Sequence, residues 1–347
     1  MNFIDNIEIK NFKSIRHQKI EGCKRINVFI GYPNVGKSNI LEAISLFSYL
    51  NKGEDLPLKC LIRFKELIDL FNDGEKQKDA EIFTKEYVLA LRYINKATLE
   101  VGVIIRNDYI EKFNSVTNNL LRHLRFDKDG RVVSATTSEY PLEKSLKKYQ
   151  FKAENGFKPA ISDQRVLDYP NGSNLSEVIR YNGNLRKQCG ELFSTYNLRL
   201  IFDENGNILV QKQLDEFSAF QFSFLQVADT LQRLIFHKAA ITTNQHSILL
   251  FEEPEAHMFP PYIRKLTTDI LFDKTNQFFL ATHSPYVLDE LILEAGEDLS
   301  VYLVDYKDGE TIIHYLSKDD LREIRQYGVD LFFNIESYLK HGQVNNS

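Results

Sequence analysis

Eight residues near the N-terminus, GYPNVGKS at 31–38, have the types and spacing that hold a phosphate chain. They fit the pattern G-x-x-x-x-G-K-[ST] in full. Gly31 and Gly36 permit backbone conformations that a side chain would forbid, so the loop can come close to phosphates. Backbone amides would then point inward and bind the phosphate oxygens, with the positive end of a following helix behind them. These amides belong to Asn34, Val35, Gly36, Lys37 and Ser38.

Two side chains of this loop carry the remaining chemistry. Lys37 is expected to reach the β- and γ-phosphates of a nucleotide, and the Ser38 hydroxyl is expected to coordinate Mg²⁺. The flanks agree with this interpretation, because the apolar segment INVFI at 26–30 predicts a buried strand before the loop. The helical pattern SNILEAISLFSYL follows the loop directly. The sequence therefore predicts a nucleotide site that binds ATP with Mg²⁺.

A second strand that reads as buried, SILLF at 247–251, runs straight into Glu252 and Glu253. Carboxylates at such a position need a cation or a reactive partner, because an unpaired buried charge is costly. A phosphate-binding loop requires an acidic residue at the end of a neighbouring strand to hold its magnesium. Glu252 is the candidate for that role, and Glu253 is the candidate general base for the attacking water. A plain surface loop after an edge strand is the alternative.

Composition narrows the class of protein. The chain has 347 residues, 43% of them hydrophobic, and a formal net charge of -5, which gives no overall attraction to nucleic acid or to anionic membrane. Its three cysteines are widely spaced, so we expect reduced thiols and neither a disulfide framework nor a zinc site. The sequence shows no signal peptide and no apolar stretch long enough for a membrane span. We expect a cytoplasmic protein without membrane association.

Strands alternate with helices at both ends of the chain, which is typical of a parallel sheet covered by helices. The first and last thirds should form two halves of one sheet. We therefore expect a single domain over 1–347, with 51–215 as an inserted lobe of β-hairpins and helices and 216–347 as the C-terminal half of the core. Hairpins are predicted over 85–105 and 198–212. Helices are predicted over 117–126, 142–150, 175–193 and 224–241.

Four segments, IKNFKSI, GYPNVGKSN, FEEPEAHMFP and ATHSP, occur in the order and rough spacing of the RecF/SMC-like branch of ABC-type ATPases. Within that branch the chain most resembles the OLD-family ATPases of bacterial anti-phage defence systems. The resemblance implies an α/β P-loop NTPase fold, namely an ABC-type ATPase head with a β-rich N-terminal lobe and an inserted helical region. It also makes Lys13 and Asn39 candidates for contact with the nucleotide; for Lys13, a surface loop is the alternative.

The same resemblance assigns roles to residues late in the chain. Glu252 would be the magnesium carboxylate, Glu253 the catalytic base and His283 the switch histidine that contacts the γ-phosphate. Glu255–His257 would belong to the D-loop. The segment FLQVADTLQRL at 224–234 lacks the usual Ser-Gly pair of a signature segment, yet Asp229, Thr230 and Arg233 stand there as candidates for completing the site of a second subunit. An amphipathic core helix is the alternative for this segment.

The resemblance further implies a homodimer or a higher homo-oligomer, with two ATP molecules at the interface. The middle region lacks the heptads of an SMC coiled coil, and the short tail after Asp305 lacks the Asp-x-Asp of the Toprim nuclease found in OLD proteins. We therefore expect an ATP-driven switch that controls a separate effector protein. The alternative is a RecF-like ATPase that binds DNA in repair or maintenance. A basic cluster of Arg122, Arg125, Lys144, Lys147 and Lys148 would supply the DNA surface, unless it is only a solvated helix face.

Overall fold

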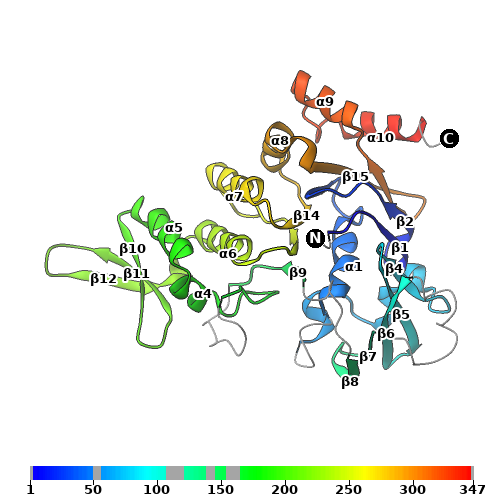
Figure 1. Ribbon diagram of the computed structural model, residues 1–347, viewed down its shortest axis with the longest axis horizontal. Helices are drawn as coiled ribbons and strands as arrows, with labels where there is room; N and C mark the ends of the chain where they lie inside the picture. Colours follow the sequence, from blue (N-terminus) through cyan, green and yellow to red (C-terminus); the bar gives the residue numbers. More distant parts are fainter. Residues whose placement is uncertain (1–2, 50–55, 107–120, 138–144, 154–164, 345–347) are drawn as a thin grey trace. The chain divides into compact units, whose positions relative to one another are not determined.

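The structure is a computed structural model that describes residues 3–49, 56–106, 121–137, 145–153 and 165–344 (Figure 1). The chain divides into two compact units. The first unit contains Met1–Lys148, His246–Glu253 and Gln277–Ser347, and the second contains Tyr149–Gln245 and Pro254–Asn276. Each unit therefore draws on segments that are far apart in the sequence.

The first unit contains a six-stranded sheet in the order β16-β15-β3-β14-β13-β9. Its strands are β3 (Ile26–Ile30), β9 (Leu146–Tyr149), β13 (Ile248–Glu252), β14 (Gln277–Ala281), β15 (Leu299–Lys307) and β16 (Glu310–Tyr315). Strands β13, β14, β3 and β15 run parallel to one another, and β16 is antiparallel to β15. All residues of β3 and β14 are buried, as expected for strands covered on both faces. The two ends of the chain thus share one sheet, as predicted.

A seven-stranded antiparallel sheet, in the order β2-β1-β4-β5-β6-β7-β8, belongs to the same unit. Its strands are β1 (Ile7–Phe12), β2 (Ile15–Ile20), β4 (Ala80–Phe83), β5 (Tyr87–Asn95), β6 (Thr98–Ile105), β7 (Arg122–Asp127) and β8 (Val132–Thr137). Helix α1 (Lys37–Tyr49) contacts β1 of this sheet and β13 and β14 of the other. Ile40, Leu41, Ile44 and Phe47 of α1 lie in the hydrophobic core that joins the two sheets. The helix that follows the phosphate-binding pattern is therefore fixed by apolar contacts with both sheets.

The remaining helices of the first unit are α8 (Pro285–Glu294), α9 (Lys318–Tyr327) and α10 (Ile335–Val344), with the short 3-10 turns η1 (Leu58–Cys60), η2 (Leu67–Leu70), η3 (Asn72–Gly74) and η5 (Gly296–Asp298). The second unit contains a three-stranded antiparallel sheet in the order β10-β11-β12. Its elements are α4 (Leu175–Tyr181), α5 (Gly183–Ser194), β10 (Leu198–Phe202), β11 (Ile208–Gln213), β12 (Ala219–Ser223), η4 (Phe224–Gln226), α6 (Asp229–Thr243) and α7 (Pro260–Phe272).

Both predicted hairpins are confirmed as β5–β6 and β10–β11. The helices predicted at 117–126 and 142–150 are wrong for the residues that the structure describes there, because Arg122–Asp127 and Leu146–Tyr149 are strands. In β7, Leu124 and Phe126 point into the core at a spacing of two, and the strand pairs with β6. Residues 117–120 and 142–144 lie outside the described residues.

Two predicted helices are shorter than expected. The pattern over 175–193 is split at Asn182, whose side-chain oxygen accepts the Leu185 N–H at 3.0 Å and caps α5. The pattern over 224–241 begins as a 3-10 turn, and the α-helix starts only at Asp229. In the first case the Asn182 side chain competes with continuation of the helix. In the second, the Gln232 amide group donates to the carbonyl oxygens of Leu225 at 3.2 Å and Val227 at 2.7 Å, just before the α-helix starts.

Candidate nucleotide site

The loop at 31–38 connects β3 to α1, as the sequence predicted. Its two glycines are required by close contacts within the protein itself, independently of any ligand. A Cβ at Gly31 would stand 2.1 Å from the carbonyl oxygen of Val304, which leaves no room for it. Gly36 has a φ of +103°, and a Cβ there would stand 2.1 Å from the Thr311 hydroxyl. A backbone oxygen at Gly31, and a positive φ with a side-chain hydroxyl at Gly36, therefore favour glycine at these positions.

The Lys37 side chain folds over this loop. Its ammonium group donates to the carbonyl oxygens of Gly31 at 3.0 Å and of Tyr32 at 2.7 Å. Burial lowers the pKa of Lys37 to about 8, although the nearby Glu253 and Glu252 carboxylates oppose this change. The two carbonyl oxygens carry only partial negative charge, so a bound polyphosphate would be a stronger partner for the Lys37 ammonium group. The arrangement holds a desolvated cation at the phosphate-binding loop.

Two carboxylates and a histidine meet at the ends of neighbouring parallel strands. Glu252 ends β13 and pairs in register with Ala281, the last residue of β14. The Glu253 amide donates to the Ala281 carbonyl at 2.8 Å, and the φ of Glu253 is +45°, an uncommon value for a residue with a side chain. The Glu253 carboxylate lies 3.5 Å from Nε2 of His283. Burial, reinforced by Lys37, lowers the pKa of His283.

Glu252 and Ser38 fit a magnesium ion by their chemistry. The Ser38 hydroxyl helps to lower the pKa of the Glu252 carboxyl group, so these two oxygen ligands lie near each other beside the phosphate-binding loop. Burial would raise the pKa of Glu252, but Lys148, Ser38 and Arg63 outweigh it and keep the carboxylate ionised. Mg²⁺ is commonly held by one or two protein oxygens together with substrate phosphates, so this pair is sufficient. Among the described residues, no group of three or more His, Cys, Asp or Glu side chains could hold a metal ion.

A chain of alternating charges leads away from Glu252. We call it the ion-pair chain, and it consists of Lys13, Glu42, Arg63, Glu252 and Lys148. Arg63 donates to Glu42 at 2.9 Å and to Glu252 at 2.9 Å, so its guanidinium group joins the two carboxylates. Lys13 forms an ion pair with Glu42, whose side chain is only 1% exposed. The ammonium group of Lys148 is 3.6 Å from the other oxygen of Glu252 and donates to the Leu61 carbonyl at 2.9 Å.

The sequence reasoning missed Glu42, Arg63 and Lys148 as neighbours of the site. Glu42 interrupts the apolar face of α1, and that break in the pattern was the one local signal of a buried pair. Lys148 was placed in a basic surface cluster, which the structure contradicts because its side chain is fully buried. Arg125 of the same cluster forms an ion pair with Glu100 at 2.6 Å. Lys144 lies outside the described residues.

The remaining candidates of the first unit lie around the loop. Asn34 is exposed with a φ of +64°, and Val35 is buried. The Asn39 amide group donates to the Ser14 hydroxyl at 2.7 Å, so it holds the turn between β1 and β2. Lys13 in that turn donates to the Arg63 carbonyl at 2.6 Å. These contacts connect the turn to the first residues of α1.

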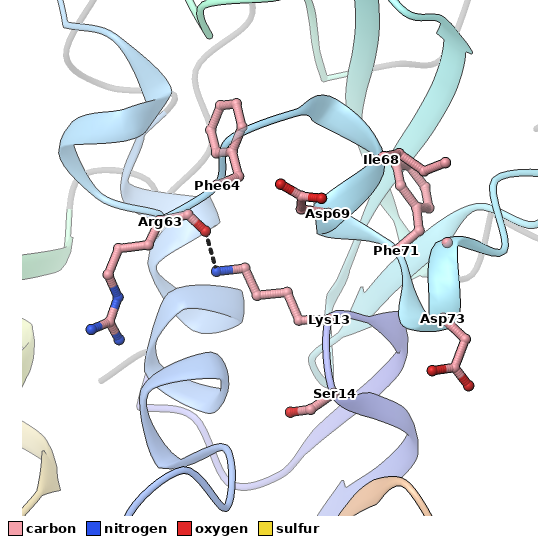
Figure 2. Close-up of a pocket in the computed structure, with 9 residues that line it drawn as sticks. Lys13, Ser14, Arg63, Phe64, Ile68, Asp69, Phe71 and Asp73 are labelled. Carbon is pink, nitrogen blue, oxygen red and sulfur yellow. Dashed lines mark hydrogen bonds between the residues drawn. The ribbon is translucent and has the colours of Figure 1, made fainter.

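A pocket of about 490 Å³ lies between that turn and residues 63–74. Figure 2 shows the Lys13 ammonium directed at the Arg63 carbonyl, with the rings of Phe64 and Phe71 above Lys13 in this view and Ser14 below it. Asp69 and Asp73 also contribute to its lining. This open pocket combines two aromatic rings with a few polar groups.

The candidates from 224–234 and from Glu255–His257 belong to the second unit. Asp229 begins α6 and forms an ion pair with Arg233 at 2.7 Å. Thr230 donates its hydroxyl to the carbonyl of His257 at 2.8 Å, and His257 has a φ of +60°. Glu255 is buried and its carbonyl accepts the Met258 amide. Within this unit, the predicted signature residues thus contact the predicted D-loop directly.

The fold and the loop geometry define a P-loop NTPase with an ABC-type ATPase head fold. A solved SMC head bound to the C-winged helix domain of ScpA has this fold, with a TM-score of 0.53 at 17% identity over 91% of this chain and 99% of that one. Residues 26–289 match the family described as "AAA domain, putative AbiEii toxin, Type IV TA system". The match spans well over half of the chain, and the chain belongs to this family.

Two relatives extend the comparison. An uncharacterized protein of Methanocaldococcus jannaschii is 27% identical over 52% of this chain and 92% of its own length. The DNA replication and repair protein RecF of Leptospira biflexa is 30% identical over 33% of this chain. The match covers only 32% of that RecF protein. The chain therefore belongs to this AAA-domain family, has the fold of an SMC head, and is similar to RecF over about a third of its length. No helix within the described ranges has the length and apolar character to cross a membrane.

Proposed function

We propose that this protein hydrolyses ATP in a Mg²⁺-dependent reaction. Lys37 and the amides of Asn34–Ser38 would bind the phosphates, and Ser38 and Glu252 would hold the metal, which supplies charge neutralisation between the β- and γ-phosphates when bound. Glu253 would accept the proton of the attacking water, and His283 would stabilise charge that develops on the γ-phosphate. The single observation that carries the proposal is the contact of 3.5 Å between His283 and Glu253 at the ends of β13 and β14.

The base and ribose of the nucleotide would bind in the pocket beside Lys13 and Ser14. Ser14 accepts a hydrogen bond from Asn39, the residue after Ser38, so the pocket adjoins the phosphate-binding loop. Phe64→Ala should weaken ATP binding several-fold but leave the binding of inorganic tripolyphosphate unchanged. Equal losses for both ligands would place the base elsewhere.

We further propose that ATP closes a homodimer and that this closure controls a separate effector, as in anti-phage defence by OLD-family ATPases. The resemblance of the sequence motifs supports this proposal, with Asp229 and Thr230 as the groups offered to the partner subunit.

Comparing wild type with Glu253→Gln tests both steps. With ATP and Mg²⁺, the variant should lose about 10²–10⁴-fold in hydrolysis. It should retain ATP and form a dimer or larger assembly by native mass spectrometry. Lys37→Met should bind no ATP and stay unassembled, and Glu294→Gln, an exposed carboxylate on α8, should behave as wild type.

Three outcomes separate the parts of this proposal. Hydrolysis by Glu253→Gln at the wild-type rate would refute the role of Glu253. ATP retention without assembly would refute closure of a homodimer. A stable complex with a second gene product, formed only in the ATP-retaining variant, would support the effector hypothesis.

A RecF-like function in DNA repair or maintenance is the second candidate, and the 30% identity to RecF over 117 residues favours it. This function predicts that Glu253→Gln with ATP binds a duplex, and that the affinity falls steeply between 50 and 200 mM salt as counterions are released. The same variant without ATP is the control. Equal or absent binding in both states would argue against this function.

A further inference from the structure

The hydroxyl group of Thr311 lies against the phosphate-binding loop, although Thr311 belongs to β16 near the other end of the chain. Its side chain is fully buried. The hydroxyl donates to the carbonyl oxygen of Val35 at 2.8 Å. The Thr311 amide donates to the carbonyl of Ser14 at 2.8 Å, which fixes β16 to the turn between β1 and β2. Thr311 therefore contacts both the loop and the turn beside it.

The hydrogen positions in this cluster follow from counting donors. The Thr311 hydroxyl uses its one hydrogen on Val35, so in its 2.6 Å contact with the Ser14 hydroxyl it must accept. Ser14 is then the donor in that contact, and it accepts from the amide group of Asn39 at 2.7 Å. The result is a one-way chain from Asn39 through Ser14 and Thr311 to the Val35 carbonyl.

This chain starts and ends on the same short segment. Val35 and Asn39 flank the residues Gly36, Lys37 and Ser38, which carry three of the five proposed phosphate-binding amides and the Ser38 hydroxyl that is proposed to bind the metal. The ends of that segment are therefore joined through two side chains from elsewhere in the fold. A Cβ on Gly36 would come within 2.1 Å of the Thr311 hydroxyl and 2.8 Å of the Ser14 hydroxyl, so the two oxygens lie directly against the loop.

We propose that Thr311 is a positioning residue of the nucleotide site, which acts with Ser14 to hold the segment from Val35 to Asn39 in the shape that binds phosphates. Hydrogen bonds in a chain polarise one another, and all members are at least partly buried, so loss of one link should weaken the others. The proposal rests on the proposed function only in taking a nucleotide as the ligand.

The first test needs no nucleotide. The Ile40 amide donates to the Gly36 carbonyl at 3.2 Å and reports on the start of α1. Hydrogen exchange of peptides covering 35–41 should be about tenfold faster at Ile40 in Thr311→Val, which has the same shape but no hydroxyl. Thr311→Ser, which keeps the hydroxyl, should exchange as wild type. Unchanged exchange in Thr311→Val would refute the proposal.

The second test measures ATP affinity by equilibrium dialysis. Thr311→Val and Ser14→Ala should each weaken binding about tenfold, the effect of one hydrogen bond. The double variant should also lose about tenfold, because either change already breaks the chain. Thr311→Ser should restore binding, and Thr84→Val, a buried threonine before β5 in the same unit, should not change it.

The outcomes distinguish this inference from the proposed function. A hundredfold, additive loss in the double variant would show two independent contacts and overturn the chain. An equal loss of ATP affinity in Thr311→Ser would show that the effect comes from packing of the threonine methyl group, and it would also overturn the hydrogen-bond chain. If wild type bound no ATP, the proposed function would fail, while the exchange of Ile40 would still decide whether Thr311 holds the loop.

Discussion

Replacing Lys148 by methionine would remove the buried end of the ion-pair chain. The Lys148 ammonium is fully buried and 3.6 Å from a Glu252 oxygen. At an effective dielectric constant of about 20, two unit charges at that separation attract by about 5 kcal/mol. Part of this lost attraction is offset, because a neutral methionine side chain has no ionic desolvation cost on folding and because Glu252 still has Arg63 as an ion-pair partner. We expect the nucleotide-free protein to lose about 2–4 kcal/mol of unfolding free energy.

Urea unfolding followed by far-ultraviolet circular dichroism measures this loss, because the chain contains no tryptophan to serve as a fluorescent probe. Lys128→Met, at an exposed lysine in the turn between β7 and β8 of the same unit, is the control, and it should stay within about 0.5 kcal/mol of wild type. Adding Glu252→Gln to Lys148→Met should cost less than the two single changes summed, since the charges are partners. A cost below about 1 kcal/mol for Lys148→Met, or strict additivity, would refute the pairing.

Three other perturbations have defined outcomes. Arg63→Gln should lower the unfolding free energy in urea by no more than about 1 kcal/mol, because the Arg63 side chain is 68% exposed although it contacts the same Glu252 carboxylate. A larger loss than that of Lys148→Met would contradict this expectation. Gly36→Ala should abolish ATP binding in equilibrium dialysis, because no space exists for its Cβ; wild-type affinity would contradict the geometry. Burial lowers the pKa of His237 to about 3, so the folded state stays neutral while the unfolded state takes up a proton below about pH 6.5. Stability should therefore fall by up to about 1.4 kcal/mol per pH unit from pH 6.5 towards pH 3, and His237→Gln should flatten this slope in circular dichroism unfolding.

Local patterns predicted the parts of this molecule whose determinants are close together in the sequence. The loop between β3 and α1, the strand that ends at Glu252 and both hairpins depend on neighbouring residues. Strands β7 and β9 were mistaken for helices because short segments with spaced leucines fit either period, and pairing with β6 and β13 decides between them. The pairing of Lys148 with Glu252 and the contact of Thr311 with Val35 have no local pattern, because each joins segments that only the folded sheet brings together.

The position of Thr311 also has a consequence for synthesis on the ribosome. Val35 and Thr311 are 276 positions apart, yet the hydroxyl of the later residue holds the earlier loop. At a synthesis rate of about 5–20 residues per second, Thr311 is added to the chain roughly 14–55 seconds after Val35. Strand β3 likewise waits for β14 and β15 on its two sides. The nascent chain should therefore bind ATP with full affinity only after β16 has left the exit tunnel, so tight ATP binding follows the completion of this sheet.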